Sequence, residues 1–292
     1  MPLASAIDKQ RLLEHFKVIS ADNTQGRKIG TLGSIKAQQY IQLQLNNMEA
    51  IPFKGSYQHP FTLNRSFQTK PVIGHNVIAV INGTKYAHRY IVLSAHYDHL
   101  GQKAGRIYNG ADDNASGTAA LLSIAKQLSN LPIEHTVIIL FTDGEESNLT
   151  GAKAFVEQNP DLLASIKLNI NMDMLAGSKS NKYLHYITKG LDKILPEQAM
   201  IKYQTNHVYT DFKVVKGFGR DKSSFKRKIN WNNASDHGAF HQKRIPFIYY
   251  GVGTHKNYHT ENDEYENSNH SLLVNSTNAV YQQLLYIDKI IN

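Results

Sequence analysis

The chain has 292 residues, a hydrophobic content of 41% and a formal net charge of +8, and it contains no cysteine. This composition allows a full hydrophobic core, while the missing thiols exclude disulfides, thiolate metal sites and a cysteine nucleophile. No run reaches the roughly 18 apolar residues that a membrane-spanning helix requires, so we expect no membrane span.

The chain begins with two predicted helices. Apolar residues recur at helical spacing over 7–18 and 34–45, and a polar, glycine-containing link separates them. Apolar runs over 72–81 and 86–93 then indicate two strands, and the Asn-Gly turn between them predicts a β-hairpin. Further along, we expect strands over 136–142, 168–172 and 247–250, and helices over 118–128, 150–158 and 271–291.

Buried strands that alternate with helices are typical of a largely parallel sheet covered on both faces. We therefore predict an α/β fold, a three-layer sandwich in which helices flank a mixed, mostly parallel central sheet. The early hairpin would add an antiparallel edge. No repeat, low-complexity tract or domain boundary is evident, so residues 1–292 are predicted to form a single domain with a helical N-terminal segment over 1–50.

Positive charge is concentrated in residues 213–228, where seven lysines and arginines accompany the single acidic residue Asp221. Such a segment could contact a nucleic acid or an anionic surface. No nucleic-acid-binding motif accompanies it, so we predict a solvated basic insertion loop and no nucleic-acid partner.

The stretch 94–117 places metal-binding side chains between a predicted strand and a predicted helix. It contains His96, Asp98, His99, Asp112 and Asp113. Each of the other predicted buried strands is also followed by candidate ligands, namely Asp143, Glu145 and Glu146, then Asp173, then His255 and His259. Because the carboxyl ends of neighbouring parallel strands meet at one sheet edge, these side chains are expected to converge.

So many carboxylates in one cleft cannot all ionise cheaply unless cations neutralise them. No lysine or arginine lies within these short motifs, but a pair of divalent metal ions would supply the charge. Histidine mixed with carboxylate, without sulfur, suits zinc, with manganese or cobalt as weaker alternatives. We therefore predict two Zn²⁺ ions as cofactors.

Six motifs occur in a fixed order along the chain: AHYDHLG, GADDNASG, DGEE, NMD, SDHGAF and YHTENDEY. In this order and at these gaps they resemble the di-zinc exopeptidase family, which includes bacterial leucyl-type aminopeptidases, glutamate carboxypeptidases and single-zinc glutaminyl cyclases. The resemblance spans about 72–291. Any one motif alone would be weak, but the set of six is specific.

The resemblance implies a set of metal ligands. Asp113 would bridge the two ions, His96 and Asp173 would complete one site, and the other site would be completed by Glu146 and His259. The peptide bond that follows Asp113 is expected to be cis, as it often is in this family.

The resemblance also implies catalytic roles. Glu145 would be the general base, acting on a hydroxide held between the two ions. Asp98 would hydrogen-bond the imidazole of His96 and fix its tautomer. Tyr258 would donate a hydrogen bond to the developing oxyanion.

These roles predict a zinc aminopeptidase that removes the N-terminal residue from peptide substrates with a free N-terminus. A carboxypeptidase or dipeptidase on the same site is an alternative, and a carboxypeptidase would need an arginine to hold the terminal carboxylate. Candidates by residue type are Arg106, Arg220, Arg227 and Arg244. A glutaminyl cyclase is disfavoured because one metal suffices there, and a non-catalytic binding module because all the implied ligands and the base are present.

Several other acidic and imidazole groups near the motifs are expected to support the site rather than to bind metal; these are Asp112, His99, Asp143, His237 and His255. Asp236 and His237 in SDHGAF are candidates for lining the cleft. The basic segment 213–228 could form a rim over the cleft that favours acidic peptides, or it could have no role there.

Family members with such motifs are commonly exported, so we expect a periplasmic or secreted protein whose signal has been removed, with a cytoplasmic location as the alternative.

Overall fold

The computed structural model describes residues 6–63, 71–205, 212–220, 223 and 228–291. Its helices are α1 (Lys9–Ile19), α2 (Leu32–Asn47), α3 (Gly117–Leu128), α4 (Thr150–Gln158), α5 (Glu197–Thr205), α6 (His237–Gln242) and α7 (His270–Asp288). Its strands are β1 (Ile51–Pro52), β2 (Gln58–Leu63), β3 (Val72–Ile81), β4 (Tyr86–His96), β5 (Gly101–Lys103), β6 (Arg106–Tyr108), β7 (His135–Thr142), β8 (Ile166–Met172), β9 (Leu184–Lys189), β10 (Val214–Lys216) and β11 (Phe247–Gly251).

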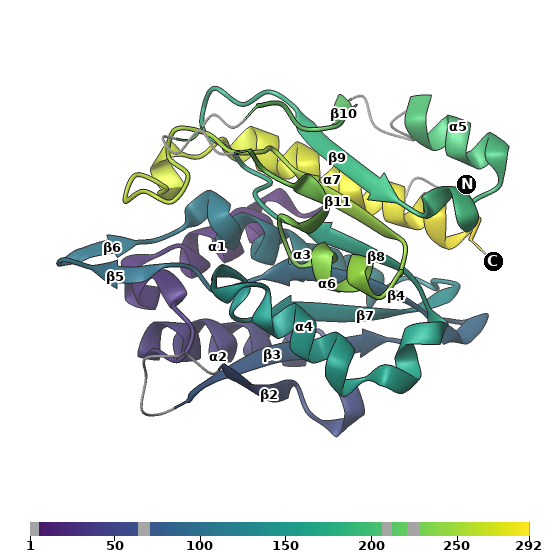
Figure 1. Cartoon of the computed structure of the whole chain (residues 1–292), viewed down its shortest axis with the longest axis horizontal. Coiled ribbons are helices and arrows are strands. Elements are labelled where there is room, and N and C mark those ends of the chain that lie inside the picture. Colours follow the sequence, from purple (N-terminus) through teal and green to yellow (C-terminus); the bar gives the residue numbers. More distant parts are fainter. Residues whose placement is uncertain (1–5, 64–70, 206–211, 221–222, 224–227, 292) are drawn as a thin grey trace.

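A nine-stranded sheet forms the centre of the molecule (Figure 1), in the order β1-β3-β7-β4-β8-β11-β9-β10 with β2 beside β3. The four middle strands β7, β4, β8 and β11 are parallel to their neighbours within this group, and antiparallel pairs flank them at β3 and β9. These four parallel strands are the ones whose carboxyl ends were predicted to carry ligands. The candidate ligands that follow these four strands therefore lie at one edge of the sheet.

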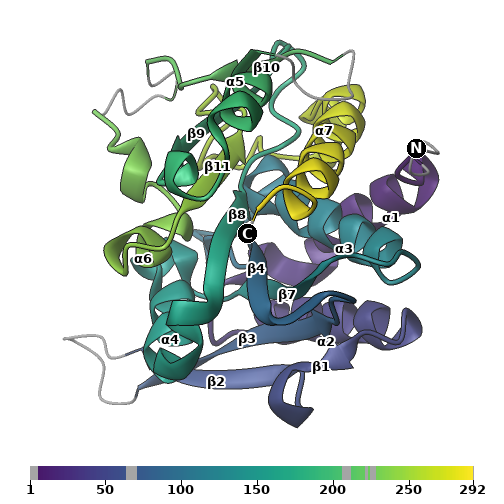
Figure 2. The same ribbon diagram turned by 90° about the vertical axis from the view of Figure 1, so that its right-hand side faces the viewer.

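Helices cover both faces of the sheet (Figure 2), with α1, α3 and α7 on one side and α4 and α6 on the other. The alternation of side chains along β7 shows why both faces must be covered. Ile139 and Phe141 pack into the core beneath α1, α2, α3 and α7, whereas Ile138 and Leu140 pack beneath α4 and α6. Every residue of β7 is buried, which is typical of a central parallel strand. The predicted three-layer α/β sandwich is confirmed.

The predicted hairpin between β3 and β4 is wrong, because β7 lies between these two strands. The Asn-Gly link instead passes around the start of β7: Gly83 donates to the Thr136 hydroxyl at 3.0 Å, and Tyr86 donates to the Glu134 carbonyl at 2.8 Å. A Cβ on Gly83 would collide with the backbone of His135 and Thr136. β7 is apolar on both faces and therefore lies between two neighbouring strands. The antiparallel edge of the sheet is formed instead by β3 with β1 and β2.

Of the basic segment 213–228, the structure describes residues 213–220, 223 and 228. Residues 214–216 form β10, which pairs in parallel with β9, so this part is an edge strand rather than a loop. The other described residues of the segment lie outside helices and strands. Within the described part of the chain, no helix is both long enough and apolar enough to cross a membrane.

Candidate metal centre

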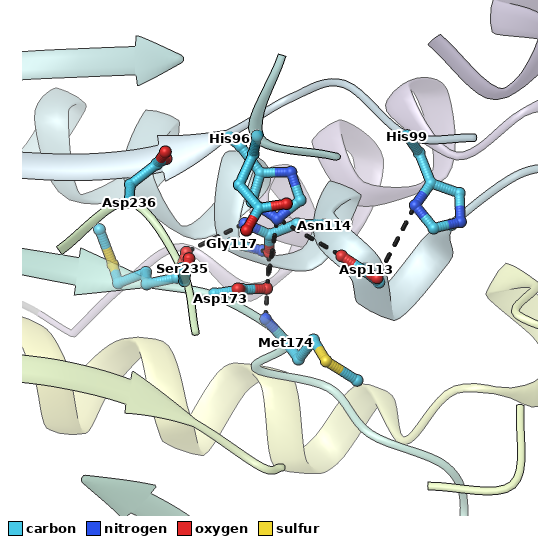
Figure 3. Close-up of polar contacts among 12 residues, drawn as sticks. His96, His99, Asp113, Asn114, Gly117, Asp173, Met174, Ser235 and Asp236 are labelled. Atoms are coloured by element: carbon cyan, nitrogen blue, oxygen red, sulfur yellow. Dashed lines mark hydrogen bonds and ion pairs between the residues drawn. The ribbon is translucent and has the colours of Figure 1, made fainter. Parts of the chain in front are cut away.

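Two groups of metal-binding side chains lie at the carboxyl ends of the parallel strands, and Figure 3 shows His96, His99, Asp113 and Asp173 among them. The ligand atoms of His96, Glu145 and Asp173 lie within 4.8 Å of one another, as do those of His99, Asp113 and Glu146. The Nε2 atom of His259 lies 3.1 Å from Asp113 Oδ2 and 3.3 Å from Glu146 Oε2. We name His96, Glu145 and Asp173 the first cluster and His99, Glu146 and His259 the second cluster.

Asp113 lies between the two clusters and faces each of them with a different oxygen atom. Its Oδ1 atom is 3.4 Å from His96 Nε2, while its Oδ2 atom is 3.1 Å from His259 Nε2 and 3.8 Å from His99 Nδ1. Burial alone raises the pKa of Asp113, but His99, His259 and His96 outweigh it and hold the pKa well below its ordinary value. The carboxylate is therefore ionised and able to serve both sides.

Strand pairing places the first cluster. Ser94 of β4 pairs with Asn171 of β8, and His96 and Asp173 each lie two residues further along these parallel strands. Their side chains consequently meet, with His96 Nε2 at 3.4 Å from Asp173 Oδ1. The Glu145 carboxylate joins them from the short turn Glu145–Ser147 that follows β7.

Glu145 is held in a setting that favours its protonated form. Burial raises the pKa of this carboxyl well above its usual value, and the negative charges of Glu146 and Asp173 raise it further, against a lowering effect of His96. A carboxylate with a raised pKa is a stronger base than an ordinary glutamate, which suits it to take up a proton and to release it again, as a general base and acid must do.

Asp98 connects the β4 end with the turn that carries both glutamates. Its carboxylate accepts the backbone N–H groups of Glu145 at 3.0 Å and of Glu146 at 3.4 Å. The Nδ1 atom of His96 lies 3.1 Å from the Asp98 main-chain oxygen and 3.6 Å from its carboxylate. The nearer partner of the imidazole is thus the Asp98 carbonyl, which leaves His96 Nε2 directed at Asp113 and Asp173.

The turn that carries Asp113 is fixed by acceptors on two sides. The Asp113–Asn114 peptide is cis, as the resemblance implied. Asp263 accepts the backbone N–H groups of Asp112 at 2.9 Å and of Asp113 at 3.0 Å. The Asn114 side chain accepts from Met174 at 3.1 Å and donates to the Met172 carbonyl at 3.0 Å, which ties the turn to the end of β8.

The fully buried Arg27 contacts the two chain segments that carry His96 and Asp113. Arg27 donates to the carbonyls of Tyr97, Asn109 and Gly110 at 2.6, 2.6 and 2.9 Å, and to that of Ile19 at 2.9 Å. Burial lowers its pKa to about 10, although the carboxylates of the site act in the opposite direction. Arg27 therefore remains a cation, and it holds together the chain segments that carry His96 and Asp113.

Sequence reasoning missed Arg27 and Asp263. Arg27 lies in a polar link where nothing local indicates that four carbonyl groups converge on it. Asp263 belongs to the YHTENDEY motif, which marks this stretch as part of the site. The motif does not indicate that the Asp263 carboxylate accepts hydrogen bonds from the Asp113 turn.

A cavity of about 310 Å³ adjoins the centre; it is lined by Asp113, Glu145, Asp173 and His259 and by the aromatic residues Trp231, Tyr249 and Tyr258, among others. Phe218 stacks on Trp231 with ring centroids 4.2 Å apart. Lys228 of the basic segment also lines this cavity. The cavity is therefore lined by aromatic rings, by a cation and by carboxylates of the metal centre.

Tyr258 stacks on His259, with ring centroids 3.9 Å apart. Burial raises the pKa of its phenol, and the neighbouring carboxylates, led by Asp113 and Glu146, raise it further. The hydroxyl is thus protonated at physiological pH and is available as a hydrogen-bond donor toward the cavity.

The residues expected to support the site have partners of their own. Asp112 accepts hydrogen bonds from Ala176, Gly177 and Ser116 on one carboxylate oxygen and from His255 on the other. These contacts engage both oxygens away from the clusters. Asp143 accepts from the His75 N–H at 3.2 Å. Asp236 accepts from the Thr142 hydroxyl, and His237 Nε2 lies 2.8 Å from the Trp231 carbonyl with its ring stacked on Tyr249. His99 is the exception, because it lies within a cluster.

The arginines considered for gripping a terminal carboxylate lie elsewhere. Arg106 pairs with Glu261 at 2.6 Å on the surface, and Arg220 and Arg244 are exposed. Arg227 falls outside the described residues. Among the residues that the structure describes, none of these arginines lines the cavity.

The donor set fits zinc or a similar divalent ion. It combines imidazole nitrogens with carboxylate oxygens in a buried site, and the only ion-pair partners of Asp113, Glu146 and Asp173 within the described part of the chain are imidazoles. The Oε1 atom of Glu146 is buried without a hydrogen bond from any described residue. A divalent ion in each cluster would compensate these charges.

Comparison with known proteins assigns the family. Residues 76–284 match peptidase family M28. The chain belongs to this family. A probable lipoprotein aminopeptidase, LpqL, of Mycobacterium tuberculosis is 30% identical over 201 residues, covering 68% of this chain and 38% of the relative. The chain spans less than half the length of the first curated relatives that it matches.

Solved structures confirm the M28 fold at lower sequence identity. The aminopeptidase from Aneurinibacillus sp. strain AM-1 superposes with a TM-score of 0.72 at 16% identity, covering 97% of this chain and 94% of the other. A glutaminyl cyclase from Fimbriiglobus ruber superposes with a TM-score of 0.73 at 15% identity, covering 97% and 96%. M28 membership supports a peptide hydrolase, and both neighbours share the architecture of this chain.

Proposed function

We propose that this M28 chain is a di-zinc aminopeptidase that hydrolyses the bond after the N-terminal residue of peptides. One observation carries the proposal: Asp113 joins two clusters of imidazole and carboxylate groups, and Glu145 lies with them on the wall of a cavity. His96 and Asp173 would hold one zinc ion, Glu146 and His259 the other, and Asp113 both. Bound zinc supplies Lewis acidity and lowers the pKa of water at the site.

The chain's own residues account for the remaining requirements of peptide hydrolysis. Glu145, with its raised pKa, takes a proton from the attacking water and passes it to the leaving amine. The protonated hydroxyl of Tyr258 donates to the carbonyl oxygen as negative charge develops on it. Asp98 keeps both glutamates in place through their backbone N–H groups.

Two observations support an aminopeptidase over the alternatives on the same fold. A free α-amine can be held by the carboxylates of Glu145 and Asp173 at the cavity wall. No described arginine lines the cavity to grip a terminal carboxylate, and Lys228, which does line it, lacks the paired donors of a guanidinium. A glutaminyl cyclase needs a single ion, yet the first cluster offers ligands for a second one.

A panel of substrates tests the assignment. Free aminoacyl anilides should be cleaved, while their N-acetylated counterparts and N-blocked dipeptides with a free carboxylate should not be. Cleavage of the N-blocked dipeptides would assign a carboxypeptidase instead. Release of ammonia from a glutaminyl peptide, without cleavage of any anilide, would assign a cyclase.

A further inference from the structure

His99 is a third imidazole at the metal centre, and the ligand set proposed above does not use it. Its side chain is completely buried, and its Nδ1 atom lies 2.7 Å from Glu146 Oε1 and 3.8 Å from Asp113 Oδ2. The ring packs against Gly110, where any Cβ would collide with it, and it meets the ring of His259 edge-on with centroids 5.7 Å apart. The fold thus holds this imidazole firmly against the second cluster.

The contacts of His99 are not those of an imidazole held by hydrogen bonds. Neither of its ring nitrogens makes a hydrogen bond with any residue that the structure describes, and the same is true of Glu146 Oε1. The two atoms are close, but they do not meet the geometry of a hydrogen bond. Buried polar atoms almost always have partners, and an ion placed between His99 Nδ1 and Glu146 Oε1 would be the partner that both atoms lack.

We propose that His99 binds, through Nδ1, the same ion as Glu146 and His259. This inference rests on the proposed di-zinc function. The second site would then have four protein ligands, His99, Asp113, Glu146 and His259. The first site would have three, His96, Asp113 and Asp173.

The two sites would consequently differ in kind. Zinc sites with four protein ligands are closed and hold their ion tightly, whereas sites with three keep an open position for water or substrate. The second site would retain its ion against a chelator, and the first would exchange its ion and present the open position to the cavity. Two residues of the first cluster, Glu145 and Asp173, line the cavity, against His259 alone from the second cluster.

A positioning role for His99 is the competing explanation. A protonated His99 could hold the Glu146 carboxylate by charge without touching the ion. The two roles differ in the proton spectrum of a paramagnetic metal form. A bound imidazole has its N–H proton shifted strongly through the bonds to the ion, whereas an imidazole beside the ion experiences only the weaker shift through space.

The test is proton NMR of the full chain loaded with Co²⁺, which counts exchangeable imidazole N–H signals moved outside the normal spectral range. We expect such signals from His96, His99 and His259 in the wild type, and the loss of one in His99→Gln. His135→Gln is the matched control, because His135 is equally buried but lies at the opposite end of β7, bonded to Asp288. This control should keep the wild-type spectrum.

Zinc retention gives a second, independent readout. In competition with a chelator, His99→Gln should lose affinity at the tighter site by about 100-fold or more, beyond the usual effect of outer contacts, and should keep the weaker site unchanged. Signals from only two imidazoles in the wild type would overturn the inference, and they decide the matter even if the variant fails to fold. Two bound ions and peptide hydrolysis with only two imidazole signals would leave the proposed function intact, whereas a wild type that binds no ion would overturn both.

Discussion

The two clusters that share Asp113 are built in different ways. The first is made where strands end, because His96 is the last residue of β4 and Asp173 follows β8 directly. The second is made by loops and turns beyond the strands, and the side chain of His259 is 24% exposed, against 1% for His96. Backbone pairing within the sheet fixes His96 and Asp173 of the first cluster, whereas Glu145 and the whole second cluster depend on the contacts that hold their loops and turns.

Replacing Asp113 should abolish both clusters at once, and this is the largest effect we expect. Asp113→Ala removes the carboxylate that faces both sides, so both zinc ions should be lost. Peptide hydrolysis should fall by roughly 10⁴-fold or more, as when a catalytic unit loses an essential member. Zinc per chain after gel filtration and initial rates on an aminoacyl anilide check this, with the exposed Asp161→Ala as the control. A variant that kept two ions would show that Asp113 is not shared.

Variants of Arg27 test whether the loops of the metal centre depend on the hydrogen bonds that Arg27 donates to them. Arg27→Met leaves four buried carbonyls without their donor, so the free energy of unfolding should fall by about 3 kcal/mol or more in urea titrations. Arg27→Lys keeps the charge but not the fork of donors, and should lie between. If the comparison holds, Arg27→Met lowers the affinity of the second cluster for its ion, relative to the wild type, by a larger factor than that of the first, because the Asp113 and His99 loops lose their support. An equal relative loss of affinity at both clusters would break the comparison.

Acid should weaken the fold through His15 of α1, which belongs to neither cluster. Burial, with the charge of Arg11 adding to it, lowers the pKa of His15 to about 4. Between pH 6.5 and 4 the unfolded chain therefore binds a proton that the folded chain does not, and stability falls as the pH falls through this window. The His15 contribution should be about 2 kcal/mol between pH 7.5 and 5.

Urea titrations of wild type and His15→Gln at both pH values measure this contribution. The variant should lose less stability on acidification, while His88→Gln, at an exposed position, should behave as the wild type does. An unchanged pH dependence in His15→Gln would show that His15 does not contribute to the acid sensitivity.

The aromatic wall of the cavity should give the smallest effect. Trp231→Ala removes apolar surface beside the first cluster without touching a proposed ligand, so KM for a leucyl anilide should rise about tenfold while kcat changes little. The exposed Tyr183→Ala serves as the control. A fall in kcat with unchanged KM would show that Trp231 acts on the chemistry rather than on binding.

The sheet could be predicted where its strands are continuous and apolar. The expected strands over 136–142, 168–172 and 247–250 correspond to β7, β8 and β11, and their parallel arrangement with β4, in the order β7-β4-β8-β11, gathers the candidate ligands as expected. The hairpin prediction failed because a local turn signal says nothing about a strand from much later in the chain. β7 is apolar on both faces, and it separates β3 from β4.

The supporting contacts of the site could not be predicted, because they join segments distant in sequence. Arg27 bonds to carbonyls more than seventy residues away, at Asn109 and Gly110, and the Asp263 carboxylate receives N–H groups from Asp112 and Asp113. His99 stands in the AHYDHLG motif, but only the folded loop brings its ring against Glu146.

Comparison of wild type and Glu145→Ala tests the central claim most directly. We predict that the wild type binds two zinc ions and cleaves free but not N-acetylated aminoacyl anilides. The variant should keep both ions and lose about 10²–10⁴-fold in rate, since it lacks only the proton carrier. A variant that retains zinc and cleaves at the wild-type rate, or a wild type loaded with zinc that cleaves no peptide or anilide, would contradict the account.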